Sequence, residues 1–276
     1  MGLMPADETG PLPPGLLDRL SARPAPGAAD LTAPRRGAGP LTGPLAADLA
    51  VLRDGGYLTL ALPARFGGAG LNLAEVACAQ RQLAARAPDL AWAVNAHHTW
   101  AGAAADALAS GDAKDLRPGW VLGQAARGAL LGGSGAGGGE EWPHLAPLGP
   151  TATQGSALLA GMYAWGLTLA GMTSYAIARR MFGLAVTRAQ RAGRSLDRWP
   201  VAEASLRLDD MRGQLDEVIA SWQQRVAAGG GVTTVDPGRL ALIREFTVRH
   251  VAADGAERVA GLAALVAGDP VAAARA

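Results

Sequence analysis

The chain is poor in cysteine, lysine and aromatic residues, and each shortage restricts the class of protein. Cys78 is the single cysteine among 276 residues, so no disulfide can form within them, and a reducing, cytoplasmic location is expected. Aromatic residues make up 5% of the chain and hydrophobic residues 49%, so the core has to consist mainly of alanine, leucine and valine. Such small side chains favour closely packed helices over a β-sandwich.

Charge is also scarce, and its two signs are nearly balanced. Charged residues make up 18% of the chain, the net charge is +1, and Lys114 is the only lysine. The arginines are scattered along the chain and almost balanced by acids, so we expect no nucleic-acid partner.

Composition and periodicity predict a mainly α protein in four parts. Residues 1–43 are rich in Pro, Gly and Ala and should be flexible, and residues 44–131 should form an N-terminal helical domain. Residues 132–165 should form a short glycine-rich connector with a β-structure remnant. Residues 166–276 should form a C-terminal helical bundle, with a last helix at 240–266.

The most specific pattern lies in a loop between two helical stretches. Leu62 to Leu73 reads Leu-Pro-Ala-Arg-Phe-Gly-Gly-Ala-Gly-Leu-Asn-Leu. Its three glycines permit positive φ in a tight bend, and Asn72 is a suitable N-cap for a helix that begins near Leu73. Because glycines carry no reactive group, we expect this loop to be structural.

The order helix, apolar run, proline turn, Phe-Gly-Gly-x-Gly-Leu and helix resembles the N-terminal helical domain of the acyl-CoA dehydrogenase family. The matching residues are Leu52, Arg53, Gly56, Pro63, Phe66, Gly67, Gly68, Gly70 and Leu71. The resemblance implies two helical domains, FAD as the cofactor, and an oxidoreductase that acts on acyl thioesters such as acyl-CoA. It also implies a homo-oligomer, or a hetero-oligomer with a homologue.

The family's middle β-domain is expected to be reduced to the connector. Residues that resemble its first strands are Pro150 to Gln154, Leu159, Gly161, Tyr163 and Trp165. The run at 132–139 contains G-x-G-x-x-G, but Glu140, Glu141, Trp142 and Pro143 follow it as a poor helix start, and after them no acid occurs until Asp197. A connector is therefore favoured over a dinucleotide site.

By the same resemblance, Trp165 and Arg191 are the residues expected to contact the cofactor. Arg191 takes the place of an arginine that meets the FAD pyrophosphate of a neighbouring subunit. A literal R-x-x-F-G at 179–183 lies too early along the helix and is interpreted as coincidence. Family members need a carboxylate base, but no acid lies between Glu141 and Asp197, and the other customary position lies beyond Ala276. We therefore assign no catalytic residue and expect a degenerate or inactive relative.

His97, His98 and Cys78 are the other candidates for chemistry. Adjacent helical residues point about 100° apart, so the two imidazoles cannot share one metal ion. We expect one histidine to face the core with a hydrogen bond and the other to be solvated. Cys78 should be a buried, inert thiol, and no metal site is expected.

Two alternatives to a flavoenzyme stay open. One is a non-catalytic helical subunit or scaffold that pairs with a complete homologue. The other is a single-span membrane protein through residues 156–178, which lie in an interval without formally charged residues. This segment is rich in Gly, Ala, Ser and Thr rather than in large apolar residues, so a buried helix is favoured.

Overall fold

The structure is a computed structural model that describes residues 11–20, 44–111, 118–131, 157–191 and 198–228. The regular elements in these ranges are all helical, without a strand, which confirms the mainly α prediction. The connector before residue 157 and the helix expected at 240–266 lie outside the described residues. The elements are η1 (Leu17–Arg19), α2 (Pro44–Asp54), η2 (Tyr57–Thr59), η3 (Ala64–Phe66), α3 (Leu73–Arg86), α4 (Pro88–Ala109), α5 (Pro118–Ala126), α6 (Ala157–Arg191) and α7 (Arg198–Ala227).

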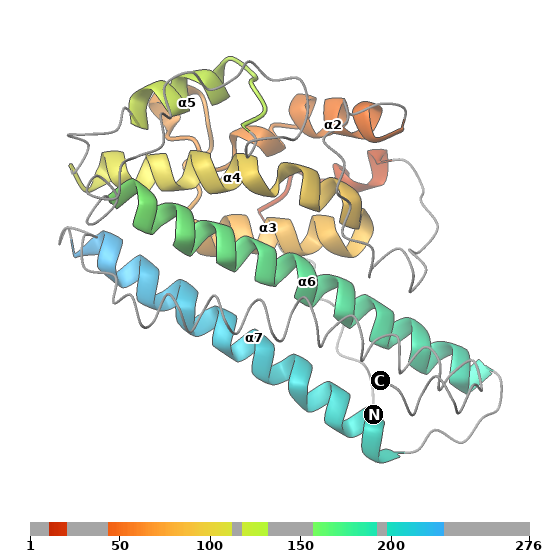
Figure 1. The fold of residues 1–276 in the computed structure, drawn as a ribbon. Helices are drawn as coiled ribbons and strands as arrows, with labels where there is room; N and C mark the ends of the chain where they lie inside the picture. Colours follow the sequence, from red (N-terminus) through yellow and green to blue (C-terminus); the bar gives the residue numbers. More distant parts are fainter. Residues whose placement is uncertain (1–10, 21–43, 112–117, 132–156, 192–197, 229–276) are drawn as a thin grey trace.

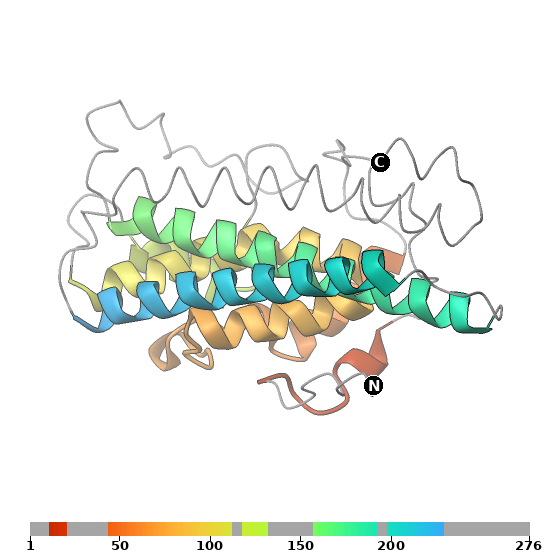
Figure 2. The same cartoon turned by 90° about the horizontal axis from the view of Figure 1, so that it is seen from below.

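Helix α4 lies between two groups of helices (Figure 1). On one side lie α2 and α5, and on the other lie α3 and α6, with α7 packed along α6. Figure 2 shows α7 beside α6 over most of its length. The helix α6 runs antiparallel to both α4 and α7 and contacts α3 as well, so it joins the N-terminal helices to α7.

The loop at 62–71 is structural, as predicted, because backbone hydrogen bonds fold it onto the preceding turn. The N–H of Gly70 donates to Leu62 O at 2.8 Å, and the N–H of Leu71 donates to Leu60 O at 2.8 Å. Gly70 has a positive φ of 68°, and a Cβ added to Gly68 would lie 2.2 Å from Leu62 O. The glycines are therefore needed for backbone conformation and for close approach.

Helix α3 begins where the sequence predicts, at a capping box. The side chain of Asn72 accepts a hydrogen bond from the N–H of Glu75 at 3.1 Å, and the N–H of Asn72 donates to the Glu75 carboxylate at 2.9 Å. The same Asn72 oxygen accepts a hydrogen bond from Gln223 of α7 at 2.8 Å. One residue therefore fixes the start of α3 and contacts α7.

We expect Asn72→Ala to lower the free energy of unfolding by about 1 kcal/mol, because the first turn of α3 loses its cap. The matched control is Gln223→Ala, which removes only the exposed contact with α7 and should cost no more than a few tenths of a kcal/mol. Urea unfolding of both variants, followed by circular dichroism, measures the difference. Equal losses in the two variants would contradict the capping role.

The strand remnant predicted around residues 159–165 was wrong, because these residues lie in the first turns of α6. Along one face of α6, buried residues recur every three or four positions: Leu158, Gly161, Trp165, Leu169, Met172 and Ala176. This is the spacing of a helix face, and packing against α3 and α4 supports it. The alternate positions Gly161, Tyr163 and Trp165 lie in a helix, where Gly161 and Trp165 are buried and Tyr163 is exposed.

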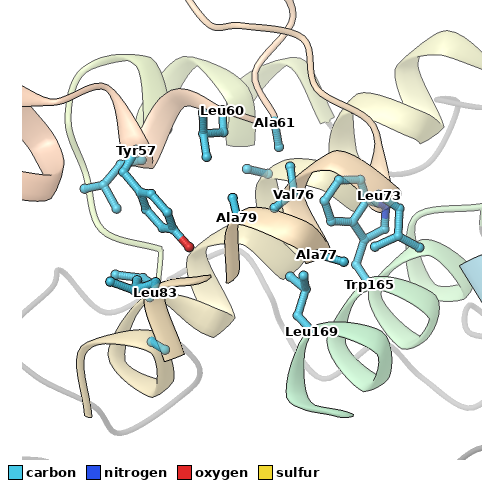
Figure 3. Close-up of a cluster of buried hydrophobic side chains, with 14 of the residues drawn as sticks. Tyr57, Leu60, Ala61, Leu73, Val76, Ala77, Ala79, Leu83, Trp165 and Leu169 are labelled. Carbon is cyan, nitrogen blue, oxygen red and sulfur yellow. The ribbon is translucent and has the colours of Figure 1, made fainter. Parts of the chain in front are cut away.

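Small residues allow α4 and α6 to approach closely. A Cβ added to Gly102 of α4 would lie 2.3 Å from the ring of Trp165, and one added to Gly161 of α6 would lie 3.0 Å from the Cβ of Ala103. Trp165 and Leu169 point from α6 into the apolar cluster that Figure 3 shows between the helices. The core is therefore made by aromatic and leucine side chains that fit against glycine and alanine.

Candidate functional site

Trp165, the residue predicted to contact the flavin, is a core residue in this structure. Its side chain is 1% exposed and lies against Gly102 of α4. Its indole Nε1 donates a hydrogen bond to Asp106 Oδ2 at 2.7 Å. The ring and its only hydrogen-bond donor are therefore both engaged inside the protein.

Asp106 is the polar group at which α4, α6 and α7 meet. Its Oδ2 accepts a second hydrogen bond at 2.7 Å, from the indole Nε1 of Trp222 on α7. Burial raises the pKa of Asp106, although the two indole hydrogen bonds act in the opposite direction. The carboxylate also lies in the last turn of α4, where the helix dipole disfavours negative charge.

Reasoning from the sequence did not single out Asp106. The available signal was its position: it lies one turn after Gly102 and Ala103 and next to Ala107, on a helix face that is otherwise apolar and small. An acid on such a face needs buried hydrogen-bond donors. The donors here come from 59 and 116 residues further along the chain, so the sequence alone could not name them.

We expect Asp106→Asn to keep both indole hydrogen bonds, because the amide oxygen accepts in the same place, and to remove the cost of burying a carboxylate. The free energy of unfolding at pH 7 should be unchanged or higher by up to about 1 kcal/mol. Asp106→Ala leaves two buried indole N–H groups without this acceptor and should cost about 2 kcal/mol or more. Thermal unfolding distinguishes the two, and a large loss in the asparagine variant would show that the charge itself is required.

His97 is the histidine that the sequence analysis expected to face the core with a hydrogen bond. Its Nε2 lies 2.6 Å from Leu58 O, and the N–H of Leu131 donates to its Nδ1 at 3.2 Å. Because a carbonyl oxygen only accepts, Nε2 carries a proton. Because Nδ1 accepts the N–H of Leu131, it carries none, and the ring is therefore neutral. Burial lowers the pKa of His97 to about 4, the charge of Arg53 acts in the same direction, and the bond to Leu58 opposes them.

His98 is also fully buried, which corrects the expectation that one of the two histidines is solvated. Its ring lies edge-on to Tyr57, with centroids 5.0 Å apart, and 5.4 Å from the ring of His97. Among the described residues, neither of its nitrogens has a hydrogen-bond partner. Burial and the neighbouring His97 hold the pKa of His98 well below its ordinary value, so it is neutral as well.

A second buried network links η2, α3, α4 and α6. The hydroxyl of Tyr57 donates to Gln80 Oε1 at 2.8 Å, and Gln80 Nε2 donates to Ala91 O at 2.7 Å and to Thr173 Oγ1 at 3.2 Å. Tyr57, Gln80 and Thr173 are all 0% exposed, and burial raises the pKa of Tyr57. A substrate would have to displace core side chains to reach these groups, so the network holds the helices together.

Trp165 and Arg191, the two residues predicted to contact the cofactor, do not form one site within the chain. Arg191 is the exposed last residue of α6, about seven helical turns or roughly 40 Å from Trp165. Arg179, from the alternative R-x-x-F-G motif, pairs with Asp209 of α7 at 3.6 Å. Trp165 does not fit a flavin contact in this structure, because it offers neither an accessible ring nor a free donor.

Three further expectations concern the burial of Cys78, a metal site and a membrane-spanning helix. Cys78 is partly exposed rather than buried, with Arg81 Nη2 at 3.8 Å from its sulfur. The parts of the chain that are described contain no group of three or more side chains able to hold a metal ion. No helix in those parts, α6 included, is long and apolar enough to cross a membrane.

Comparisons with known proteins leave the resemblance to acyl-CoA dehydrogenases as a hypothesis. No family model, curated protein or solved structure matches the chain. The geometry around Trp165 and Asp106 is therefore the information that bears on function.

Proposed function

We propose that the chain is a non-catalytic helical relative of the acyl-CoA dehydrogenases, which uses its helices for packing and assembly and not for flavin chemistry. The observation that carries this proposal is the state of Trp165. A residue that contacts a cofactor has to expose its ring or its donor to the ligand, whereas Trp165 is 1% exposed and bonded to Asp106. Binding a flavin there would require α4 and α6 to separate.

Apolar side chains of α6 and α7 that lie outside the core support the assembly part of the proposal. Tyr163 on α6 is 54% exposed and Leu206 on α7 is 70% exposed. Met181 and Leu184, further along α6, are half-buried and do not belong to the core formed by the described residues. These side chains give a second copy, or a complete homologue, apolar positions against which to pack.

A flavoenzyme is the second candidate, and Asp106 is the observation that favours it. The sequence has no acid between Glu141 and Asp197, where one customary position of the family's base lies, and the structure brings a partly buried carboxylate of raised pKa next to Trp165. A carboxylate in such surroundings is a candidate for proton transfer. If the chain were an enzyme, Asp106 would be the first residue to test as its base.

One assay separates the two candidates. The full chain is incubated with FAD, a series of acyl-CoA substrates and an artificial electron acceptor, and reduction of the acceptor is followed. The proposal predicts no reduction above background for the natural chain or for Asp106→Asn. Turnover by the natural chain that is lost in Asp106→Asn, at equal stability, would establish the enzyme instead.

The assembly part of the proposal is tested by sedimentation velocity over a concentration series, with and without a flavin-loaded acyl-CoA dehydrogenase. We expect a dimer or a mixed complex that Leu184→Glu weakens. A monomer at every concentration, unchanged by the added enzyme, would contradict this part.

A further inference from the structure

A hydrogen bond that only the neutral imidazole ring can make connects His97 of α4 to the backbone of Leu131. The ring accepts the N–H of Leu131 at Nδ1, while its proton is on Nε2, facing Leu58 O. A second proton could only be added at Nδ1. It would then face the N–H of Leu131 across 3.2 Å, so that two donors would oppose each other.

The chain on the N-terminal side of Leu131 is held independently of His97. The N–H of Ala129 donates to Gln124 O at 3.1 Å, and Gly128, with a φ of 85°, closes the end of α5. Leu131 itself is 1% exposed, so its side chain is buried as well. Loss of the His97 bond would therefore act on Leu131 and leave the end of α5 in place.

We propose that His97 is an acid-sensitive contact, whose protonation detaches Leu131 from α4 while the helices stay folded. This inference does not depend on the proposed function, since it concerns only the neutral ring and its two backbone partners. It gives the chain a local conformational change that a proton can trigger.

Among the charged groups around His97, Arg53 acts against protonation, whereas the hydrogen bond to Leu58 favours it. On α4 itself lies His98, which is neutral, and η2 contributes Tyr57, which burial also keeps neutral. On α2, Arg53 lowers the pKa of His97, while Asp48 is 1% exposed and engaged in an interaction of its own. Helix α5 carries no ionisable side chain. Burial therefore has the largest effect on the pH at which His97 takes up a second proton, and the charge of Arg53 lowers that pH further.

The test uses the full chain and two measurements across a pH series from neutral to acid. Nuclear magnetic resonance of the imidazole nitrogens reports the protonation of His97. Hydrogen exchange, corrected for the intrinsic rate at each pH, reports the protection of the Leu131 amide, with Leu83 in α3 as the reference. We expect the protection of Leu131 to be lost in step with the titration of His97, while Leu83 stays protected.

Three variants sharpen the test. His97→Phe should reduce the protection of Leu131 about tenfold or more already at neutral pH, because the acceptor is gone. The matched control, His98→Phe, replaces an adjacent and equally buried histidine and should leave Leu131 protected. Arg53→Met should move both the titration of His97 and the release of Leu131 to higher pH by the same amount.

Two results would overturn the inference. One is a Leu131 amide that stays protected after His97 has become charged. The other is loss of protection at Leu131 and Leu83 together. This result would show that acid unfolds the whole chain and does not release Leu131 locally.

Discussion

Gly102→Ala is expected to lower the free energy of unfolding by about 3 kcal/mol. The added Cβ would lie 2.3 Å from the ring of Trp165, which is buried and held by its hydrogen bond to Asp106. The ring cannot move aside, so α4 and α6 have to separate and lose part of their packing. On helix propensity alone, the same substitution would stabilise the chain by about 1 kcal/mol. The sign of the change therefore decides whether close packing at Gly102 is real.

The matched control is Gly183→Ala, in the interior of α6. A Cβ there would meet no other atom within 4 Å, so only the gain in helix propensity remains. We expect this variant to be more stable than the natural chain by about 0.5 to 1 kcal/mol. Urea unfolding of both variants gives the comparison, and equal stability of the two would contradict the packing of α4 against Trp165.

Lowering the pH from 7 to 4.5 is expected to cost about 2 kcal/mol of unfolding free energy through His97 alone. Burial holds the pKa of His97 at about 4 in the folded chain, against about 6.5 in the unfolded chain. Its contribution is therefore complete above pH 6.5 and falls as the pH drops towards 4, because the unfolded chain takes up the proton first. His98 acts in the same direction, since burial lowers its pKa as well.

Asp106 has the opposite sign and has to be removed from this measurement. Its folded pKa is raised, so its contribution is complete at low pH and is lost as the pH rises. Urea unfolding in the Asp106→Asn background therefore isolates the histidines. We expect His97→Phe in that background to reduce the slope between pH 7 and 4.5, with the remaining slope coming from His98. A natural chain whose stability does not change over this range would contradict the buried, neutral state of His97.

Local features could be predicted from the sequence because neighbouring residues determine them. Asn72 and Glu75 are three residues apart, and their capping box starts α3 at Leu73 as expected. The turn at 62–71 follows from the positions of its glycines, two of which have positive φ.

Features that depend on distant helices could not be predicted. Both histidines are buried because α4 is covered by η2 and α5 as well as by α3 and α6. Trp165 was expected in a strand beside a flavin, because the sequence around it resembles the first strands of the family's β-domain. Its neighbours in the structure, Gly102, Asp106 and Trp222, come from other parts of the chain, and they place it in the core.

The central claim is that Trp165 belongs to the helical core and not to a cofactor site, and the flavin content of the full chain tests it most directly. The purified chain is incubated with excess FAD, free flavin is removed by gel filtration, and the flavin absorbance of the protein peak is measured. We expect a protein peak without flavin absorbance. A stable ratio of one flavin per chain would contradict it, because Trp165 could not then remain packed against Gly102 and bonded to Asp106.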